Sequence, residues 1–215
     1  GETFCALDHA SLIWEQGHSI AIMGESGSGK STLARLMIGL ERPSEGRVLI
    51  NGVDTTKWGL REWRKYRGKI QAVFQDAGGT LNPSWSTSKN VEEALVNLTD
   101  LSPSQRKNRI AELMDQTGLS KSLLDTPVRK LSGGEQRRLA LLRSLSISPE
   151  FLILDEVTAG LDLISTEAVL QLLEKYEQEH DCAYLVITHD IQVASRLCEV
   201  IYEIEHGKFT KKAVR

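Results

Sequence analysis

Short apolar runs alternate along this chain with segments whose apolar residues recur at helical spacing. The runs lie at positions 19–23, 69–75, 151–154 and 183–187. The last two are almost continuously apolar, which is typical of parallel strands buried on both faces of a sheet. Between these two runs, four apolar residues recur at i, i+3, i+4 and i+7, which predicts a helix with one apolar face: Val169, Leu172, Leu173 and Tyr176. The alternation predicts an α/β fold with a mainly parallel sheet.

The pattern also predicts an antiparallel portion and an early helix. Residues 47–50 form a short strand that ends at Asn51-Gly52, a pair that favours a tight turn. Near the end of the chain, residues 200–204 and the pair His206-Gly207 predict a terminal hairpin. The helix is expected over residues 32–40, directly after the first strand. The sheet is therefore expected to be mixed.

The middle of the chain, residues 81–145, has a helical pattern with polar linkers and no clear strand. Ser102-Pro103 is a helix-start signal, because proline is well tolerated in a first helical turn. Ile110, Leu113 and Met114 supply the apolar face of that helix, and Gly118 ends it. We expect an inserted helical subdomain over this stretch.

Composition narrows the class of protein without pointing to a particular chemistry. The chain has 215 residues, of which 40% are hydrophobic and 26% charged, as in ordinary globular domains. A formal net charge of -3 gives no general attraction to nucleic acid or to acidic membranes. Apolar runs fall short of the roughly 18 residues that span a bilayer. No signal peptide opens the chain, so secretion is not expected. Because it starts at Gly1, we expect a trimmed sequence or one that lacks an N-terminal segment.

The three cysteines, Cys5, Cys182 and Cys198, are far apart and do not form a CxxC pair. This spacing favours buried or reduced thiols in the cytosol over a disulfide framework or a zinc site.

A glycine-rich segment follows the first apolar run and matches the pattern G-x-x-x-x-G-K-[ST]. It consists of Gly24, Glu25, Ser26, Gly27, Ser28, Gly29, Lys30 and Ser31, followed by Thr32 in the expected helix. Glycines allow backbone N–H groups to converge on phosphate oxygens, and a helix N-terminus favours an anion. A lysine at this position adds charge to the β- and γ-phosphates, and a serine hydroxyl offers a ligand to Mg²⁺. The segment predicts a nucleotide-phosphate loop, and an ordinary structural turn is the alternative.

Two acidic residues, Asp155 and Glu156, follow the apolar run at 151–154. Ligands of open α/β sheets bind at the carboxyl ends of strands. Alone, such a pair is more often a solvated turn. Together with the phosphate loop, it predicts that Asp155 holds Mg²⁺, directly or through water, and that Glu156 orients and polarises the attacking water.

A second glycine-containing helix start lies in the middle region. It comprises Leu131, Ser132, Gly133, Gly134, Glu135 and Gln136. Ser132 is suited to cap the following helix. Gly133 and Gly134 leave backbone N–H groups at the helix start open to an anion. By itself the segment is an ordinary helix N-cap. Two phosphate-binding helix starts in one chain suggest a nucleotide held between two chains.

These segments, in this order, resemble the ATP-binding-cassette (ABC) ATPases over nearly the whole chain. Residues 24–31 resemble the Walker A loop, 151–156 the Walker B strand, and 131–136 the signature motif. The resemblance implies that Gln75 is the Q-loop glutamine and a magnesium ligand, that residues 159–162 with Asp162 form the D-loop, and that His189 contacts the γ-phosphate. It implies a P-loop NTPase fold: a RecA-like core at 1–80 and 146–215, and a helical subdomain at 81–145. Phe4 either stacks on adenine or only packs locally.

Within the family, residues 24–27, 73–76 and 81–83 resemble importers of dipeptides, oligopeptides, nickel and metal-opine complexes, and residues 161–164 resemble the nickel-type members. The chain departs from the family at Val157, usually proline, at Ala159-Gly160, usually Ser-Ala, and at Lys130, often acidic. None of these removes a phosphate ligand, although Lys130 could alter communication with membrane subunits. A C-terminal cysteine cluster found in several peptide importers is not present in these 215 residues.

The resemblance implies an ATPase that binds ATP and Mg²⁺ and energises an importer from the cytoplasmic face of a bacterial membrane. Two ATPase chains would form a head-to-tail dimer, and we expect a paralogue as the second chain, with a homodimer as the alternative. Two membrane-spanning permease subunits would dock beside Gln75 and at residues 76–88, where Trp85 is either a contact or local packing. An extracytoplasmic substrate-binding protein would act indirectly.

Other ATPase classes share these motifs. DNA-repair and chromosome ATPases place a long coiled coil between the phosphate loop and the signature, and Lys30 and Ser132 are too close for that. Ribosome-acting factors normally carry two cassettes. Basic residues among Trp58, Trp63 and Tyr66 could suggest nucleic-acid binding, but such a cluster is more often a solvated helix face, and no nucleic-acid partner is expected.

Overall fold

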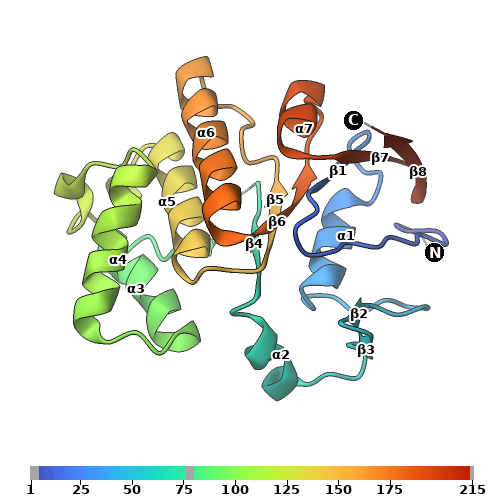
Figure 1. Cartoon of the computed structure of the whole chain (residues 1–215), viewed down its shortest axis with the longest axis horizontal. Coiled ribbons are helices and arrows are strands. Elements are labelled where there is room, and N and C mark those ends of the chain that lie inside the picture. The colour runs from blue at the N-terminus through green and yellow to red at the C-terminus, as the bar shows by residue number, and fades with distance from the viewer. Residues whose placement is uncertain (1–4, 76–79, 214–215) are drawn as a thin grey trace. The chain divides into compact units, whose positions relative to one another are not determined.

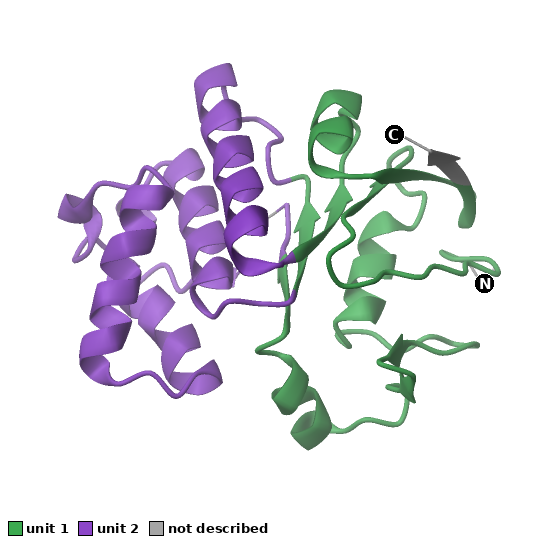
Figure 2. Cartoon of the chain, in the orientation of Figure 1, with its two compact units in different colours: residues 1–72, 151–156, 183–215 green, residues 73–150, 157–182 purple. Residues whose placement is uncertain are grey.

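The computed structural model describes residues 5–75 and 80–213, with side chains described to residue 210. The chain divides into two compact units (Figure 2). Unit 1 comprises residues 1–72, 151–156 and 183–215, and unit 2 comprises residues 73–150 and 157–182. Helix α6, in residues 157–182, therefore groups with the second unit. The boundaries at residues 81 and 145 for an inserted helical subdomain stay a prediction.

Unit 1 is built around a mixed sheet (Figure 1). Its elements are β1 (Ile20–Met23), α1 (Lys30–Met37), β2 (Leu49–Ile50), β3 (Val53–Asp54), α2 (Leu60–Tyr66), β5 (Phe151–Asp155), β6 (Ala183–Ile187), α7 (Ile191–Leu197), β7 (Val200–Glu205) and β8 (Lys208–Ala213). Strand β4 (Ile70–Val73) ends where the chain passes into unit 2. The sheet order is β4-β5-β6-β1-β7-β8, and β2 and β3 form a separate pair.

The middle strands of the sheet are parallel and buried, as their apolar runs predict. Strand β1 pairs in parallel with β6 and with β7, and β5 pairs in parallel with β6. Ala21 and Ile22 are fully buried, as are Leu152–Leu154 in β5. The antiparallel β7–β8 hairpin confirms the terminal hairpin. In the β2–β3 turn, Asn51 and Gly52 have φ values of 51° and 76°, as the predicted tight turn requires.

Helix α1 ends at Met37, three residues before the end predicted from the pattern. Gly39 has φ +70°, its N–H donates to Leu36 O, and Leu40 N–H donates to Arg35 O, at 3.1 and 2.9 Å. These two bonds form a Schellman motif, which stops a helix at a left-handed glycine. A Cβ on Gly39 would lie 2.2 Å from the Trp63 ring. Gly39 thus ends the helix, and Trp63 from α2 occupies the space that a Cβ on Gly39 would fill. The apolar pattern alone did not reveal this end.

Unit 2 is helical, as predicted for the middle of the chain. Its elements are α3 (Thr87–Leu98), α4 (Pro103–Gln116), η2 (Lys121–Leu123), η3 (Val128–Lys130), α5 (Gly133–Ser146) and α6 (Leu163–His180). Ser102 caps α4 with Pro103 in its first turn, and Leu113 and Met114 are fully buried. The predicted face of α6 is also buried, and Tyr176 Oη donates to Leu145 O at 2.9 Å. Among the described residues, no helix is both long and apolar enough to cross a bilayer.

Candidate functional site

The predicted phosphate loop connects the end of β1 to the start of α1. Gly29 has φ +104°, and a Cβ there would lie 2.3 Å from the carbonyl oxygen of Ala6, so only glycine fits this position. Gly29 is also the N-cap of α1, and no side chain caps that helix start. The first-turn N–H groups of α1 therefore lack a side-chain acceptor, which is the arrangement that an anion at a helix N-terminus requires.

Lys30 folds back over this loop. Its Nζ donates to the carbonyl oxygens of Gly24 and Glu25, at 2.8 and 2.7 Å, and to Ser28 Oγ at 3.3 Å. Burial lowers the pKa of Lys30, while the carboxylates of Glu156 and Asp155 act in the opposite direction. The loop thus holds an ammonium group through uncharged partners, next to the backbone N–H groups that would bind a phosphate.

The phosphate-loop helix and the acidic strand end meet directly. Ser31 Oγ donates to Asp155 Oδ2 at 3.1 Å, although the two residues are 124 positions apart. Asp155 is 5% exposed at the end of β5. Burial and the Glu156 charge raise the pKa of Asp155, whereas the Ser31 hydrogen bond and the Lys30 charge lower it. A hydroxyl beside a carboxylate provides the hard oxygen ligands that Mg²⁺ prefers, so these residues fit a magnesium nucleotide.

Glu156 is paired with His189. His189 Nδ1 lies 3.0 Å from Glu156 Oε1, and this hydrogen bond raises the pKa of His189. Glu156 has φ +52°, and its N–H donates to Ile187 O at 2.9 Å, so the carboxylate turns toward the end of β6. The Glu156 side chain is 14% exposed and the His189 ring is 74% exposed. A shielded carboxylate is thus combined with an accessible imidazole.

These unit 1 residues all lie at the carboxyl ends of neighbouring parallel strands. The phosphate loop follows β1, Asp155 ends β5 and is followed by Glu156, and His189 lies just after β6. Because β5, β6 and β1 are adjacent in the sheet, the three strand ends meet at one edge. The arrangement can bind a phosphate, hold a divalent cation, and offer a carboxylate as a proton acceptor.

The second helix start, in unit 2, forms a complete capping box. Ser132 Oγ accepts the Glu135 N–H at 3.2 Å, and Glu135 Oε2 accepts the Ser132 N–H at 2.7 Å. The Ser132 N–H and the Ser132 hydroxyl, which donates to Glu135 Oε2 at 2.8 Å, lower the pKa of the Glu135 carboxyl. Leu131 is buried, and Gln136 Nε2 donates to Leu131 O at 3.0 Å. The cap on α5 is therefore confirmed, and a nucleotide role for residues 131–136 stays a prediction.

The other residues predicted for the site or for permease docking belong to unit 2 or lie outside the described residues. Gln75 is exposed just beyond β4, in unit 2. Asp162 caps α6, because its carboxylate accepts the Ser165 N–H at 2.8 Å and the Ser165 hydroxyl at 2.9 Å. Trp85 has Lys89 Nζ 4.6 Å from its ring centroid, a local cation–π contact. Phe4 and the docking residues 76–79 lie outside the described residues.

Sequence reasoning missed one contact between the predicted D-loop and the helix that begins with the predicted signature motif. Arg137, in the second turn of α5, donates through Nη1 to the carbonyl oxygen of Ala159 in the predicted D-loop. Both residues belong to unit 2. An arginine five positions after Ser132 is the only signal in the sequence, and it does not identify the acceptor.

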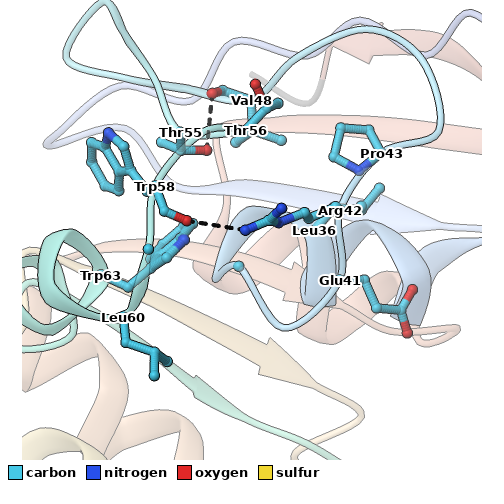
Figure 3. Close-up of a pocket in the computed structure, with 12 residues that line it drawn as sticks. Leu36, Glu41, Arg42, Pro43, Val48, Thr55, Thr56, Trp58, Leu60 and Trp63 are labelled. Carbon is cyan, nitrogen blue, oxygen red and sulfur yellow. Dashed lines mark hydrogen bonds between the residues drawn. The ribbon is translucent and has the colours of Figure 1, made fainter.

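A cavity of about 230 Å³ in unit 1 contains none of the predicted site residues (Figure 3). Its walls include Leu36, Pro43, Trp58 and Trp63, and Arg42 Nη2 donates to Trp58 O at 3.3 Å. Trp58 and Trp63 are 9% and 8% exposed and pack edge to face, with ring centroids 5.2 Å apart. These indoles are engaged in packing, so they do not offer a surface for stacking on bases.

The cysteines are described as reduced thiols, with Cys5 exposed and Cys182 and Cys198 buried. Burial raises the pKa of Cys182 to about 12, which keeps this thiol protonated at neutral pH.

Comparison with known proteins gives consistent matches. A sequence model described as ABC transporter matches residues 7–159. The nickel import ATP-binding proteins NikE of Rhodospirillum rubrum and Escherichia coli K12 are each 36% identical to the chain. The matches cover 96% and 97% of this chain and 75% and 78% of the relatives.

Two solved structures are also similar. The dimeric structure of a post-hydrolysis state of the ATP-binding cassette MJ0796, bound to ADP and Pi, is 33% identical with a TM-score of 0.91. It matches over 98% of this chain and 91% of that one. CbiO1 of Clostridium perfringens, part of the ABC transporter complex cbiONQ, is 31% identical with a TM-score of 0.82, over 95% of this chain and 80% of that one.

Proposed function

The chain belongs to the ABC transporter family, and from this premise we propose that it powers the import of nickel, peptides or metal-chelate complexes. It is an ATPase subunit of an ABC importer, binds ATP with Mg²⁺ and couples hydrolysis to transport. The nickel assignment is supported by the names of its relatives. The peptide and chelate classes are supported by the resemblance of residues 73–76 and 81–83 to such importers.

The contact between Ser31 and Asp155 is the observation that carries this function. It joins the start of α1 to the end of β5, so a phosphate bound at the loop would lie beside the Asp155 carboxylate, the proposed ligand of its metal. When bound, Mg²⁺ neutralises charge on the phosphates. Lys30 contacts the β- and γ-phosphates, and Thr32 and residues 24–29 contribute loop and first-turn N–H groups. Gln75 provides a further oxygen ligand.

Glu156 is the proton acceptor of the reaction. Its Oε1 lies 3.0 Å from His189 Nδ1, so the base and the imidazole that contacts the γ-phosphate are held together. Glu156 takes a proton from the attacking water, while the His189 imidazole stabilises the phosphoryl oxygens. Residues 131–136 and Asp162 of a second ATPase chain complete the site, which makes hydrolysis dependent on a closed dimer.

The proposed assembly contains two ATPase chains, two membrane-spanning permease subunits and an extracytoplasmic binding protein. The dimeric state of the similar cassette supports the pairing, and the import function of the relatives supports the membrane partners. We favour a paralogue as the second ATPase, docking of the permeases beside Gln75 and at residues 76–88, and a location on the cytoplasmic face of the membrane.

The test replaces Glu156 with glutamine, which keeps the shape and removes the proton acceptor. Glu156→Gln is expected to bind ATP normally, to hydrolyse it more slowly by about 10²–10⁴-fold, and to accumulate as an ATP-bound dimer with the second ATPase chain. Phosphate release and size-exclusion chromatography measure these effects. Glu199→Gln is the matched control, because it also breaks a Glu–His pair, at 2.8 Å from His18, away from the site. Near-normal turnover in Glu156→Gln would exclude this assignment.

A dimer of identical Glu156→Gln chains would support a homodimer. A dimer that forms only after a paralogous subunit is added would support the heterodimer.

A further inference from the structure

A short backbone ladder in unit 2 links the turn at residues 82–86 and the first two residues of α3 to the segment that leads into the signature helix. The N–H groups of Thr87 and Ser88 donate to Thr126 O and Leu124 O, at 3.0 and 2.9 Å. In the opposite direction, the N–H groups of Val128 and Arg129 donate to Trp85 O and Pro83 O, both at 3.0 Å. Ser86 and Pro127 form an antiparallel bridge between them. The two segments therefore form one small paired unit.

This paired unit continues directly into the signature motif. Leu131 N–H donates to Val128 O at 3.0 Å, and Val128 and Leu131 are both buried. Gln136, inside the motif, donates from Nε2 to Leu131 O at 3.0 Å and to Val128 O at 3.4 Å. A displacement of residues 127–129 therefore changes the position of Ser132 and the first turn of α5.

Asn90 holds the other end of the ladder. It is 3% exposed on α3, and its Oδ1 accepts the Asn82 N–H at 2.8 Å. Its Nδ2 donates to Asn82 O and to Ser86 O, at 3.2 and 3.0 Å. Both amide protons and the amide oxygen are thus used within one turn. A buried amide with this complete set of partners fixes residues 82–86 to α3.

The same helix is joined to the middle of α5. Arg143 Nε donates to Asn90 O at 3.1 Å, and Arg143 Nη2 contacts Glu93 Oε2 at 2.7 Å. Helix α5 is therefore tied to α3 at Arg143 and, through the ladder, at its own first turn. The signature motif cannot shift along this path without moving the turn at 82–86.

From these contacts we infer that Asn90 is a positioning residue that couples displacement of the turn at residues 82–86 to the signature helix start. This rests on the proposed function, in which permease subunits dock at residues 76–88. A permease that moves the turn would thereby align Ser132 and its neighbours for the ATP of the opposite chain, and regulate hydrolysis from the docking surface. Asn90 acts through the ladder, because its side chain bonds to Asn82 and Ser86, neither of which is a predicted phosphate ligand.

The first experiment measures this link in the chain alone. Hydrogen exchange is compared among wild type, Asn90→Ala and Asn97→Ala. Asn97 is the matched control, because it is an exposed asparagine on the same helix whose side-chain amide donates to the backbone oxygen and the carboxylate of Glu93. Asn90→Ala is expected to speed exchange at Val128 and Arg129 by about tenfold, as expected for loss of roughly 1.4 kcal/mol of support. Unchanged exchange at these two amides would overturn the inference.

The second experiment uses the assembled importer. Asn90→Ala is expected to lower permease-stimulated ATP turnover by about tenfold, with nucleotide affinity within about twofold of wild type, and Asn97→Ala should match wild type. If Asn90→Ala fails to fold, Asn90→Asp, which keeps the acceptor oxygen and loses both donors, is expected to show the same effects. Stimulation that survives in a folded Asn90 variant would overturn the inference. Failure of the wild-type chain itself to respond to permeases would instead overturn the proposed function, together with this consequence of it.

Discussion

The hydrogen bond between Ser31 and Asp155 can be tested by removing one oxygen atom. Ser31→Ala deletes the hydroxyl that donates to Asp155 Oδ2 at 3.1 Å, and it leaves a 5% exposed carboxylate without this donor. Hydrogen bonds to charged groups contribute about 1.5–3 kcal/mol. We therefore expect the free energy of unfolding to fall by roughly that amount, and Tm to fall by roughly 3–12 °C for a chain of this size.

The loss should depend on pH in a defined direction. Burial already raises the pKa of Asp155, and the Ser31 hydroxyl acts against this rise. A carboxyl whose folded pKa exceeds its unfolded pKa stabilises the fold below the unfolded value, and this stabilisation is lost as pH rises through the folded pKa. Ser31→Ala raises the folded pKa further. Its cost is therefore largest at a pH high enough to ionise Asp155, and it shrinks as the pH is lowered and Asp155 becomes protonated.

Urea unfolding of wild type, Ser31→Ala and Ser31→Thr at several pH values measures this effect. Ser31→Thr keeps the hydroxyl and should stay close to wild type. The same three proteins should differ in Mg²⁺ dependence, because Ser31→Ala removes a proposed metal ligand and should weaken the Mg²⁺-dependent part of ATP affinity. A Ser31→Ala protein with wild-type stability at neutral pH and an unchanged Mg²⁺ dependence would refute the reasoning.

Two further substitutions examine the neighbouring groups. Lys30→Ala should weaken ATP binding by roughly 100-fold or more, because it removes a charged donor to phosphate. Calorimetric titration measures the affinity, with the exposed Lys65→Ala as control. Retained ATP affinity in Lys30→Ala would contradict the phosphate-loop assignment. In an NMR titration, His189 should have a raised pKa in wild type that returns toward 6.5 in Glu156→Gln. The stabilisation from the Glu156–His189 pair is therefore complete below pH 6.5, the ordinary pKa of histidine, and is lost as the pH rises through the raised pKa of His189. An identical His189 titration in both proteins would show that the pairing does not persist in solution.

The phosphate loop could be predicted from sequence because its chemistry is local. Eight consecutive residues contain the glycines, the lysine and the serine, and the apolar run and helix on either side set the direction of the loop. The structure confirms this strand–loop–helix arrangement. The position of Asp155 beside the phosphate loop was predictable from its place at a strand end, because parallel strands bring their carboxyl ends to the same edge.

Contacts that depend on strand order could not be predicted in the same way. Glu156 and His189 meet because β5 and β6 are neighbours in the sheet, and nothing in the spacing of 33 residues specifies that order. Trp63 illustrates a related limit, since it packs against Gly39 just beyond α1 and is thereby removed from the surface. The basic and aromatic pattern around it was ambiguous until the packing partner was known.

The charges at the strand ends explain why a magnesium nucleotide suits this site better than either ion alone. Lys30 is held by two carbonyl oxygens and a hydroxyl, none of which carries a full charge, and burial lowers its pKa. Asp155 has the opposite condition, a buried carboxyl whose pKa is raised by burial and by Glu156. A phosphate alone would compensate the charge of Lys30 but would add negative charge near Asp155. A cation alone would compensate the charge of Asp155 but would add positive charge near Lys30. Only a ligand that carries both charges relieves both groups, so ATP and Mg²⁺ should bind with positive mutual cooperativity that depends on Lys30 and Asp155 together.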